Sequence, residues 1–223
     1  MKFIDLNADL GESTDYHLQE QLLHLITSAN IACGGHAGDA DTMRITLEQC
    51  RRHQVAAGAH PSYPDRENFG RQTLAISQAE LTASIAAQVN ALGPVTHVKP
   101  HGALYNEAAK DPQIAQAIAD AIQPGPVLYG LKGSLMLDVF RKAGFRIARE
   151  VFADRAYQPD GSLRPRHLPG ALITGPEEAA ANALKLAEDA DTICLHSDTP
   201  GAVEIARAVR QTLEQNGYHL RPV

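Results

Sequence analysis

The feature that most limits the fold of this chain is a regular alternation of β-prone apolar runs with segments of helical periodicity. Seven runs are predicted strands: Phe3–Asn7, Asn30–Cys33, Val55–Ala59, His97–Lys99, Pro126–Tyr129, Arg146–Phe152 and Thr192–Leu195. Strands that alternate with helices favour a parallel sheet covered by helices. Because no linker, low-complexity tract or internal repeat interrupts the alternation, we expect residues 1–223 to form one domain.

The predicted helices carry apolar stripes and start signals. The stripes, which are typical of faces that pack on a core, are Leu18, Leu22 and Leu25; Leu81, Ile85, Val89 and Leu92; and Ile205, Val209 and Leu213. Ser77 and Glu80 have the spacing of a capping box. Asp111-Pro112 and Thr199-Pro200 each place a capping residue before a proline suited to the first turn, so a helix is predicted to begin at each.

Clusters of polar residues follow nearly every predicted strand. A doubly wound sheet would usually concentrate its chemistry near one switch point. A closed barrel instead brings the carboxyl ends of all its strands to one face. The expected fold is therefore a distorted (β/α)7–8 TIM-like barrel.

Composition and charge exclude several classes of protein. Lys and Arg total 20 against 26 Asp and Glu, a formal charge of −6 without a basic run, which argues against nucleic-acid binding. No stretch approaches the ~18 apolar residues of a membrane span. The N-terminal MKFIDLNADLGE does not resemble a signal peptide, and three widely spaced cysteines support neither a disulfide framework nor a CxxC metal site. We expect a soluble, cytoplasmic protein with no nucleic-acid or membrane partner.

The first predicted strand has a polar face. Asp5, Asn7 and Asp9 alternate and therefore point to the same side of the strand. A polar face on a buried strand is costly unless its groups are paired or face a cavity. Two interpretations remain open: paired structural carboxylates, or carboxylates that face a site.

The second predicted strand leads into a glycine-rich turn, CGGHAGD, that contains His36. Glycines at such a place allow sharp bends or a close approach to a ligand, and glycine-rich turns that lead into a helix can also bind anions. Asp39 suits either a helix cap or a functional role. Cys33 is interpreted as a small buried residue, since nothing in the sequence would lower its pKa.

Four of the ten histidines fall at the ends of four different strands. They are His36, His60, His101 and His196. Histidine can act as an acid, a base or a metal ligand near neutral pH, and nearby aspartates could orient it or complete a metal site. We assign no chemistry to the helix and loop histidines His17, His24, His53, His167 and His219.

Three cations stand close to these strand ends. Lys99, Arg71 and Arg155 could clamp a carboxylate or a phosphate. For the two arginines, surface ion pairing is an equal alternative. Common catalytic motifs are absent: the sequence holds no GxSxG, no HExxH and no GK[ST]. Any use of ATP must therefore rely on another type of site or on another subunit.

At these residues the sequence strongly resembles the LamB/YcsF family. The matching segments run from residue 5 to residue 198: DLNADLGE, ANIACGGHAGD, GAHPSYPDRENFGR, HVKPHGALYN, EVFADRAYQPDGSLRPR and CLHSD. The resemblance implies a distorted barrel related to glycoside hydrolase/deacetylase barrels. Two departures stand out: His196-Ser197-Asp198 replaces the family's usual His-Gly-Asp, and Ala187–Asp191 is a shorter segment than usual.

The same resemblance implies an activity and partners. It implies ATP-dependent opening of 5-oxo-L-proline (pyroglutamate) to L-glutamate, with ATP as co-substrate, by a chain that acts with two partner subunits, B and C. A homo-oligomer is possible in addition. No divalent metal is predicted at a defined protein site.

On this interpretation, residues at the strand ends receive roles as hypotheses. Asp9, His60 and His101 are candidates for proton transfer, and Lys99 would stabilise developing negative charge. Arg71 and Arg155 would hold the substrate carboxylate or a phosphate. The remaining predicted site residues are Glu12, His36, Asp154 and His196, which complete or orient the catalytic group, and Asn7, Tyr105 and Asn106, which bind substrate.

Two other functions remain open. The first is a metal-dependent, deacetylase-like hydrolase of another amide, in which Asp9, His36 and His60 bind an ion that activates water. The second is a non-catalytic subunit that holds the lactam while its partners react with it.

Overall fold

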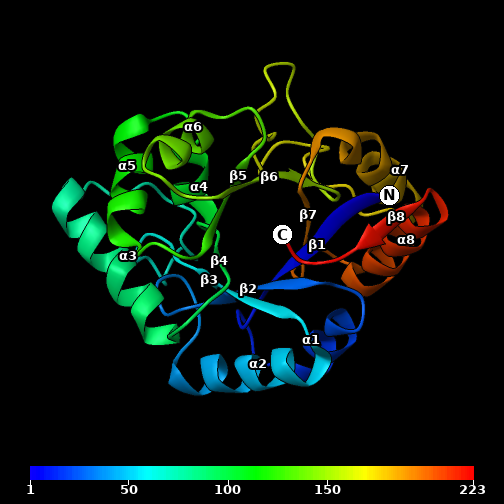
Figure 1. The fold of residues 1–223 in the computed structure, drawn as a ribbon, viewed down its shortest axis with the longest axis horizontal. Helices are drawn as coiled ribbons and strands as arrows, with labels where there is room; N and C mark the ends of the chain where they lie inside the picture. The colour runs from blue at the N-terminus through cyan, green and yellow to red at the C-terminus, as the bar shows by residue number, and fades with distance from the viewer.

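Seven parallel strands close into a barrel in the computed structural model, which describes all residues from Met1 to Val223 (Figure 1). The strands of the barrel are β1 (Lys2–Leu10), β2 (Ser28–Ala32), β3 (Ala56–His60), β4 (His97–Val98), β5 (Val127–Leu131), β6 (Ile147–Phe152) and β7 (Thr192–His196). Each strand pairs with the next, and β1 pairs with both β2 and β7, which closes the sheet. The predicted barrel is confirmed.

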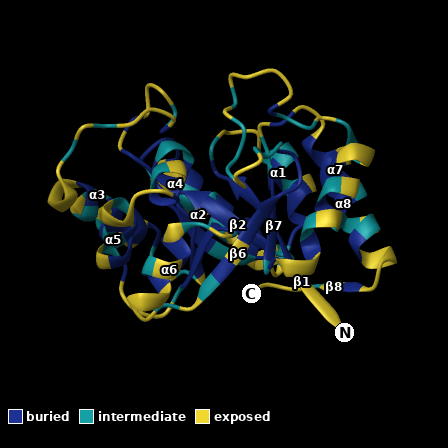
Figure 2. Ribbon diagram, turned by 90° about the horizontal axis from the view of Figure 1, so that it is seen from above, coloured by how far each residue is buried: buried dark blue, intermediate teal, exposed yellow.

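Helices surround the barrel and cover its outer face (Figure 1). They are α1 (Tyr16–Leu23), α2 (Ala40–His53), α3 (Gln78–Leu92), α4 (Gly102–Ala108), α5 (Pro112–Ala121), α6 (Leu135–Lys142), α7 (Pro176–Leu186) and α8 (Ala202–Gln215), with a 3-10 turn, η1, at Ala187–Asp189. A hydrophobic cluster of 50 buried residues fills the space around the strands. In Figure 2 both chain ends lie on one side of the molecule, and long exposed loops lie on the other.

The alternation in β1 separates the core from the barrel interior. Ile4, Leu6 and Ala8 are buried in the hydrophobic cluster. Asp5 and Asn7, on the opposite face, are buried among polar groups of neighbouring strands. The barrel therefore has a polar interior, with each layer held by hydrogen bonds across strands.

The layer deepest in the barrel shows how such a carboxylate is accommodated. Asp5 accepts hydrogen bonds from the hydroxyls of Thr27, Ser28, Tyr129 and Thr192 at 2.6–3.0 Å. Burial still raises the pKa of the Asp5 carboxyl, because these bonds do not fully replace water. Asp5 is thus a paired structural carboxylate, the first of the two interpretations of the polar face.

Most of the predicted helix starts are confirmed. Ser77 and Glu80 form the capping box of α3, and Asp111 caps α5 with Pro112 in its first turn. Asp39 proves to be a cap: its side chain accepts from Thr42 N at the start of α2. The stripe residues of α3 and α8 are buried as expected.

The predicted helix start at Thr199-Pro200 is wrong. Helix α8 begins at Ala202, after Gly201 in a left-handed conformation. Thr199 instead donates its hydroxyl to Oδ2 of Asp154 at 2.7 Å. The buried carboxylate takes the hydroxyl that would otherwise cap the helix. The α1 stripe is also shorter than predicted, since that helix ends at Leu23 and Leu25 lies beyond it.

The final strand was not predicted. β8 (Tyr218–Leu220) pairs with the first residues of β1, outside the closed barrel.

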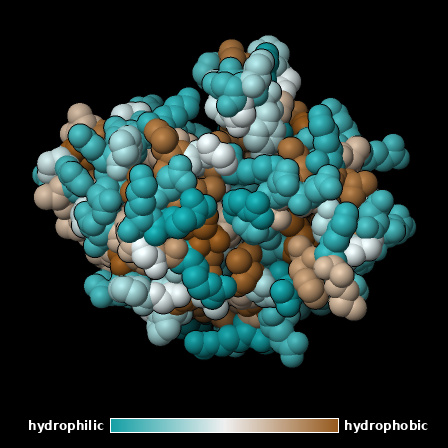
Figure 3. Space-filling model, turned by 45° about the horizontal axis from the view of Figure 1, so that its top comes forward, coloured by the Kyte–Doolittle hydropathy of each residue, from teal (hydrophilic) through white to brown (hydrophobic).

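Large exposed apolar side chains are few: Met1, Phe3, Leu135, Leu168 and Val223. Hydrophilic side chains predominate on the face drawn in Figure 3, with hydrophobic atoms visible between them. None of the helices is both long and apolar enough to cross a bilayer.

Candidate active site

A cavity of about 440 Å³ opens at the carboxyl ends of the strands. Its floor is formed by Asp9, His60 and Lys99, and Arg71 and Arg155 lie on its walls. Other predicted residues that line it are Glu12, His101, Tyr105, Asn106 and His196. The volume lies within the usual range for small-molecule sites, roughly 300–1,000 Å³.

Lys99 follows β4, and its ammonium lies at the centre of the cavity floor. Nζ lies 2.8 Å from Oδ1 of Asp9, 3.1 Å from Oε1 of Glu150 and 2.9 Å from Sγ of Cys194. Burial opposes the charge, but the carboxylates of Asp9 and Glu150 outweigh it and hold the pKa of Lys99 well above its usual value. Burial likewise raises the pKa of the Cys194 thiol, so it is neutral beside the ammonium.

A second layer of hydrogen bonds lies beneath this ion pair. Asn7 donates Nδ2 to Oε1 of Glu150 at 3.1 Å, and Tyr105 donates its hydroxyl to Oε2 of Glu150 at 2.7 Å. Asn30 donates to Oδ1 of Asp9 at 2.8 Å. These contacts fix both carboxylates around Lys99. Asn7 itself is fully buried below the cavity, and its substrate-binding role stays a prediction.

Gly58 makes room for another part of this layer. A Cβ atom at residue 58 would overlap Nε2 of His97, so only glycine lets the imidazole enter the barrel. Nε2 of His97 lies 3.0 Å from Oδ1 of Asn30. Burial lowers the pKa of His97 to about 3, and the nearby Lys99 charge adds to this shift. His97 is therefore a neutral structural residue.

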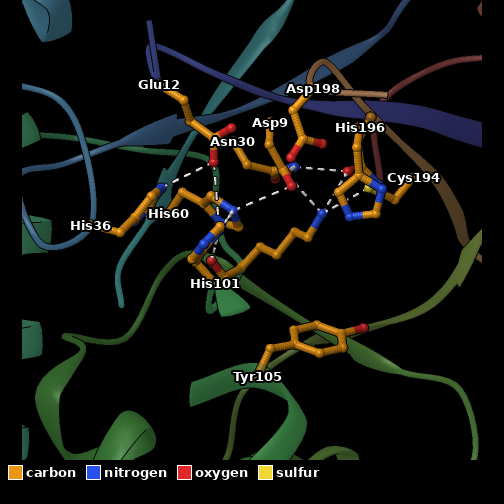
Figure 4. A network of polar contacts seen from close by, with 12 residues as sticks. Asp9, Glu12, Asn30, His36, His60, His101, Tyr105, Cys194, His196 and Asp198 are labelled. Atoms are coloured by element: carbon orange, nitrogen blue, oxygen red, sulfur yellow. Dashed lines mark hydrogen bonds and ion pairs between the residues drawn. The ribbon is translucent and has the colours of Figure 1, made fainter. Parts of the chain in front are cut away.

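Three of the four predicted strand-end histidines meet on one side of the cavity (Figure 4). The rings of His36 and His101 stack at 3.7 Å, and His60 lies edge-on to both. Nε2 of His60 lies 3.4 Å from Oδ2 of Asp9, and Nε2 of His36 lies 3.0 Å from Oε1 of Glu12. Burial lowers the pKa of both His36 and His101.

An unusual backbone conformation supports this histidine cluster. Phe69 has φ of 56°, in the left-handed region that non-glycine residues rarely adopt. Its carbonyl oxygen accepts a hydrogen bond from Nε2 of His101 at 3.0 Å, and its ring packs edge-on against His36 and His101. Strain of this kind persists where the surroundings hold it, commonly at functional sites.

His196 lies apart from the other three histidines and pairs with Asp154. Nδ1 of His196 lies 2.9 Å from Oδ1 of Asp154, whose Oδ2 accepts from the backbone N–H of His196. Burial would raise the pKa of Asp154, but the His196 imidazole and the Thr199 hydroxyl outweigh it and lower the pKa. Asp154 does not line the cavity; it fixes the ring of His196, which does.

The walls of the cavity carry several cations. Asp198 lies between Arg71 and Arg166, at 2.6 and 3.0 Å. Arg155 is almost fully buried, and one of its terminal nitrogens donates to the carbonyl of Arg164 at 2.7 Å. Its Nε is buried without a partner. Burial, together with the Arg166 charge, lowers the pKa of Arg155 to about 10, so it is still cationic near neutral pH.

The sequence missed several residues of the site. Glu150, within β6, received no predicted role, although it completes the contacts of Lys99. His167, Arg164 and Arg166 also line the cavity, whereas His167 was assigned no chemistry. The close spacing of these three residues in LRPRH was the signal that could have found them. Cys33 is buried as expected, and burial raises the pKa of its thiol to about 12.

Fold and site together define a parallel β/α-barrel protein with a buried acid–base and cationic centre at the carboxyl ends of its strands. The chain belongs to the LamB/YcsF family, whose profile matches residues 4–223.

Relatives with similar sequences share one name. The chain is 47% identical to the 5-oxoprolinase A subunit of Geobacillus kaustophilus, over a 248-position alignment that covers 99% of this chain and 97% of the relative. It is 43% identical to the 5-oxoprolinase A subunit of Heliobacterium modesticaldum, with 98% and 97% covered. Both alignments are longer than the 223 residues of this chain, so the relatives contain segments that it lacks.

Solved structures agree with the fold. The lactam utilization protein of Thermus thermophilus superposes with a TM-score of 0.90 at 42% identity, with all of both chains covered. A structure described as T48 deacetylase with substrate gives a TM-score of 0.52 at 14% identity, covering 98% of this chain and 87% of the other. That second likeness shows the fold alone.

Proposed function

We propose that this chain is the A subunit of an ATP-dependent 5-oxoprolinase, which opens 5-oxo-L-proline to L-glutamate with subunits B and C. The observation that carries the proposal is the buried ammonium of Lys99, held by Asp9 at the floor of a cavity with cationic walls. The names of the relatives supply the reaction. In this proposal, residues 1–223 act as one domain in the cytoplasm.

The reaction needs the kind of groups that the cavity contains. A five-membered lactam is a resonance-stabilised amide and a poor electrophile for water. Phosphorylation of its oxygen by ATP would make the ring carbon far more reactive, which explains the coupling to ATP. Ring opening then needs a base for water, an acid for the departing nitrogen, and stabilisation of negative charge.

Residues of the cavity floor fit these tasks. Lys99 stays charged in a buried position and would stabilise negative charge on the lactam oxygen. Asp9, His60 and His101 form a connected chain of polar contacts through which a proton could move between water and the ring nitrogen. Tyr105 positions Glu150 behind the lysine and also lines the cavity.

Residues of the cavity walls fit the anionic parts of the substrate. Arg71 and Arg155 would hold the ring carboxylate or the transferred phosphate, and Asn106 would contact the lactam. The unpaired Nε of Arg155 is a buried donor that a carboxylate would satisfy. Glu12, His36, Asp154 and His196 would position these groups, and Asn7 would act from beneath through Glu150.

The test is glutamate formation from 5-oxo-L-proline and ATP, measured with this chain alone, with subunits B and C alone, and with the complete mixture. We expect glutamate only from the complete mixture. A second preparation with Lys99→Met should assemble with B and C yet form far less glutamate. Absence of glutamate from a complex whose assembly has been verified by gel filtration would contradict the proposal.

A further inference from the structure

The histidine cluster contains two ring nitrogens that face each other. His60 Nδ1 lies 2.7 Å from the carbonyl oxygen of Lys99, and His101 Nε2 lies 3.0 Å from that of Phe69. A carbonyl oxygen only accepts hydrogen bonds, so each of these outer nitrogens carries a hydrogen. In a neutral imidazole the other nitrogen then has a lone pair. Those inner nitrogens, His60 Nε2 and His101 Nδ1, lie only 3.0 Å apart (Figure 4).

Each of these inner nitrogens has a carboxylate beside it. Oε1 of Glu12 lies 3.5 Å from Nδ1 of His101, and Oδ2 of Asp9 lies 3.4 Å from Nε2 of His60. Ligand atoms of Glu12, His60 and His101 all lie within 4.8 Å of one another. Ligand atoms bonded to a tetrahedral Zn²⁺ at about 2.0–2.1 Å are separated by about 3.3 Å, and the three separations here, 3.0, 3.4 and 3.5 Å, are close to that value.

We propose that His60, His101 and Glu12 bind a divalent transition-metal ion of the zinc class. Two imidazoles and one carboxylate are a ligand set that such ions accept, with a further position left open for water or substrate. All three side chains line the cavity, so the open position faces the place where a substrate would enter. Asp9 lies beside the ion.

The residues behind these ligands have the arrangement that holds metal-binding histidines. Each ligand histidine donates its outer N–H to a backbone carbonyl, which fixes its tautomer and the direction of its lone pair. His36 donates Nε2–H to Oε1 of Glu12 and so orients that carboxylate. Its buried Nδ1 lacks a partner, which suits the lone pair of a neutral ring.

The geometry favours a bound ion over a shared proton. A proton between the histidines would bridge only Nε2 of His60 and Nδ1 of His101. An ion would also contact Glu12, whose ligand atom lies within 4.8 Å of both imidazoles.

The inference that these residues bind a metal ion depends only on their geometry. The role of the ion in a reaction depends on the proposed function. In that reaction the ion would activate water in place of His60 and His101, and Asp9 would remain the proton acceptor.

Metal binding by the isolated chain tests the inference without substrate or partners. Protein treated with a chelator is incubated with Zn²⁺ or Co²⁺, freed of unbound metal, and analysed by elemental mass spectrometry and, for Co²⁺, by visible absorption. We expect about one ion per chain and the intense Co²⁺ bands of low coordination number. Loss of a residue that only hydrogen-bonds to a metal ligand weakens metal binding by about 10–100-fold. Since His60 and His101 are ligands themselves, His60→Asn and His101→Asn should weaken it by at least about 100-fold.

The surface group Glu20, His24 and His53 provides a matched control, because its ligand atoms also lie within 4.8 Å of one another. His53→Asn should leave binding unchanged. If a histidine variant does not fold, Glu12→Gln, at the partly exposed edge of the cluster, tests the same site and should also weaken metal binding. Absence of stoichiometric binding, or undiminished binding in folded His60→Asn, His101→Asn or Glu12→Gln, would overturn the site. So would loss of binding in His53→Asn.

Discussion

Nζ of Lys99 lies 2.8 Å from Oδ1 of Asp9, where neither side chain is more than 4% exposed. The two residues come from β1 and from the segment after β4, on different sides of the barrel. An ion pair so deeply buried is held by the whole closed sheet, and its charges face the cavity rather than bulk water. Such a pair supplies a fixed positive charge at a place where water is scarce.

Lys99→Met should lower both stability and turnover. The change leaves the carboxylates of Asp9 and Glu150 buried without their cation, which costs about 3–5 kcal/mol for a broken buried pair. Turnover of the complete complex should fall ~10²–10³-fold, as for loss of one charge-stabilising donor. Urea unfolding and the glutamate assay measure the two effects.

The matched control for Lys99 is Lys132→Met. Lys132 pairs with Asp189 at 3.4 Å in an exposed position. An exposed pair contributes about 0–1 kcal/mol, so stability and turnover should scarcely change. Equal losses in both variants would show that the buried pair has no special role.

Asp9→Asn should lower turnover while the fold persists. The amide keeps the size of the side chain but removes the charge that faces His60 and Lys99. Loss of a proton-transfer group lowers turnover ~10²–10⁴-fold. Steady-state kinetics of the reconstituted complex measures the effect, with Asp41→Asn, an exposed helix residue, as the control. An affinity loss without a change in turnover would favour a non-catalytic, lactam-binding subunit.

Arg155→Met should separate substrate binding from stability. Arg155 Nε is buried without a partner, and the lowered pKa shows that the fold disfavours its charge. We therefore expect the KM for 5-oxo-L-proline to rise by at least about tenfold, the effect of losing roughly 1.4 kcal/mol of binding, with no fall in Tm. Arg146→Met, at an exposed position, is the control. An unchanged KM would remove Arg155 from the substrate site.

Asp154→Asn should reduce stability in a pH-dependent way. The pKa of Asp154 is lowered in the folded protein because, against the effect of burial, His196 and Thr199 stabilise the carboxylate. A carboxyl whose pKa is lower in the folded than in the unfolded protein stabilises the fold at pH values above its unfolded pKa of about 4. This contribution is lost as the pH falls through the folded pKa.

Denaturant unfolding across the acid range measures this dependence. At pH 7 the variant should be less stable by about 1.5–3 kcal/mol, typical of hydrogen bonds to a charged group. The difference should shrink as the pH falls below about 4. Asp138→Asn, in an exposed pair with Arg141, should differ little from the wild type at any pH. A difference that stayed constant down to low pH would contradict the role given to the Asp154 charge.

Much of the fold could be predicted because its signals are local. Helix caps such as Ser77 and Asp111 act on N–H groups two or three residues away, and the stripe of α3 follows from helical periodicity alone. Thr199 shows the limit of this reasoning, because a carboxylate 45 residues away in sequence takes its hydroxyl.

The amino-acid sequence was sufficient to predict the order of the seven barrel strands, the polar face of β1, and the placement of His36, His60, His101 and His196 at strand ends. These features depend on spacing along the chain. Which of these residues meet depends on the folded barrel: three histidines lie close to Glu12, while His196 pairs with Asp154. Strand register and barrel closure set such contacts, and they arise from many pairings across the sheet that no local pattern records.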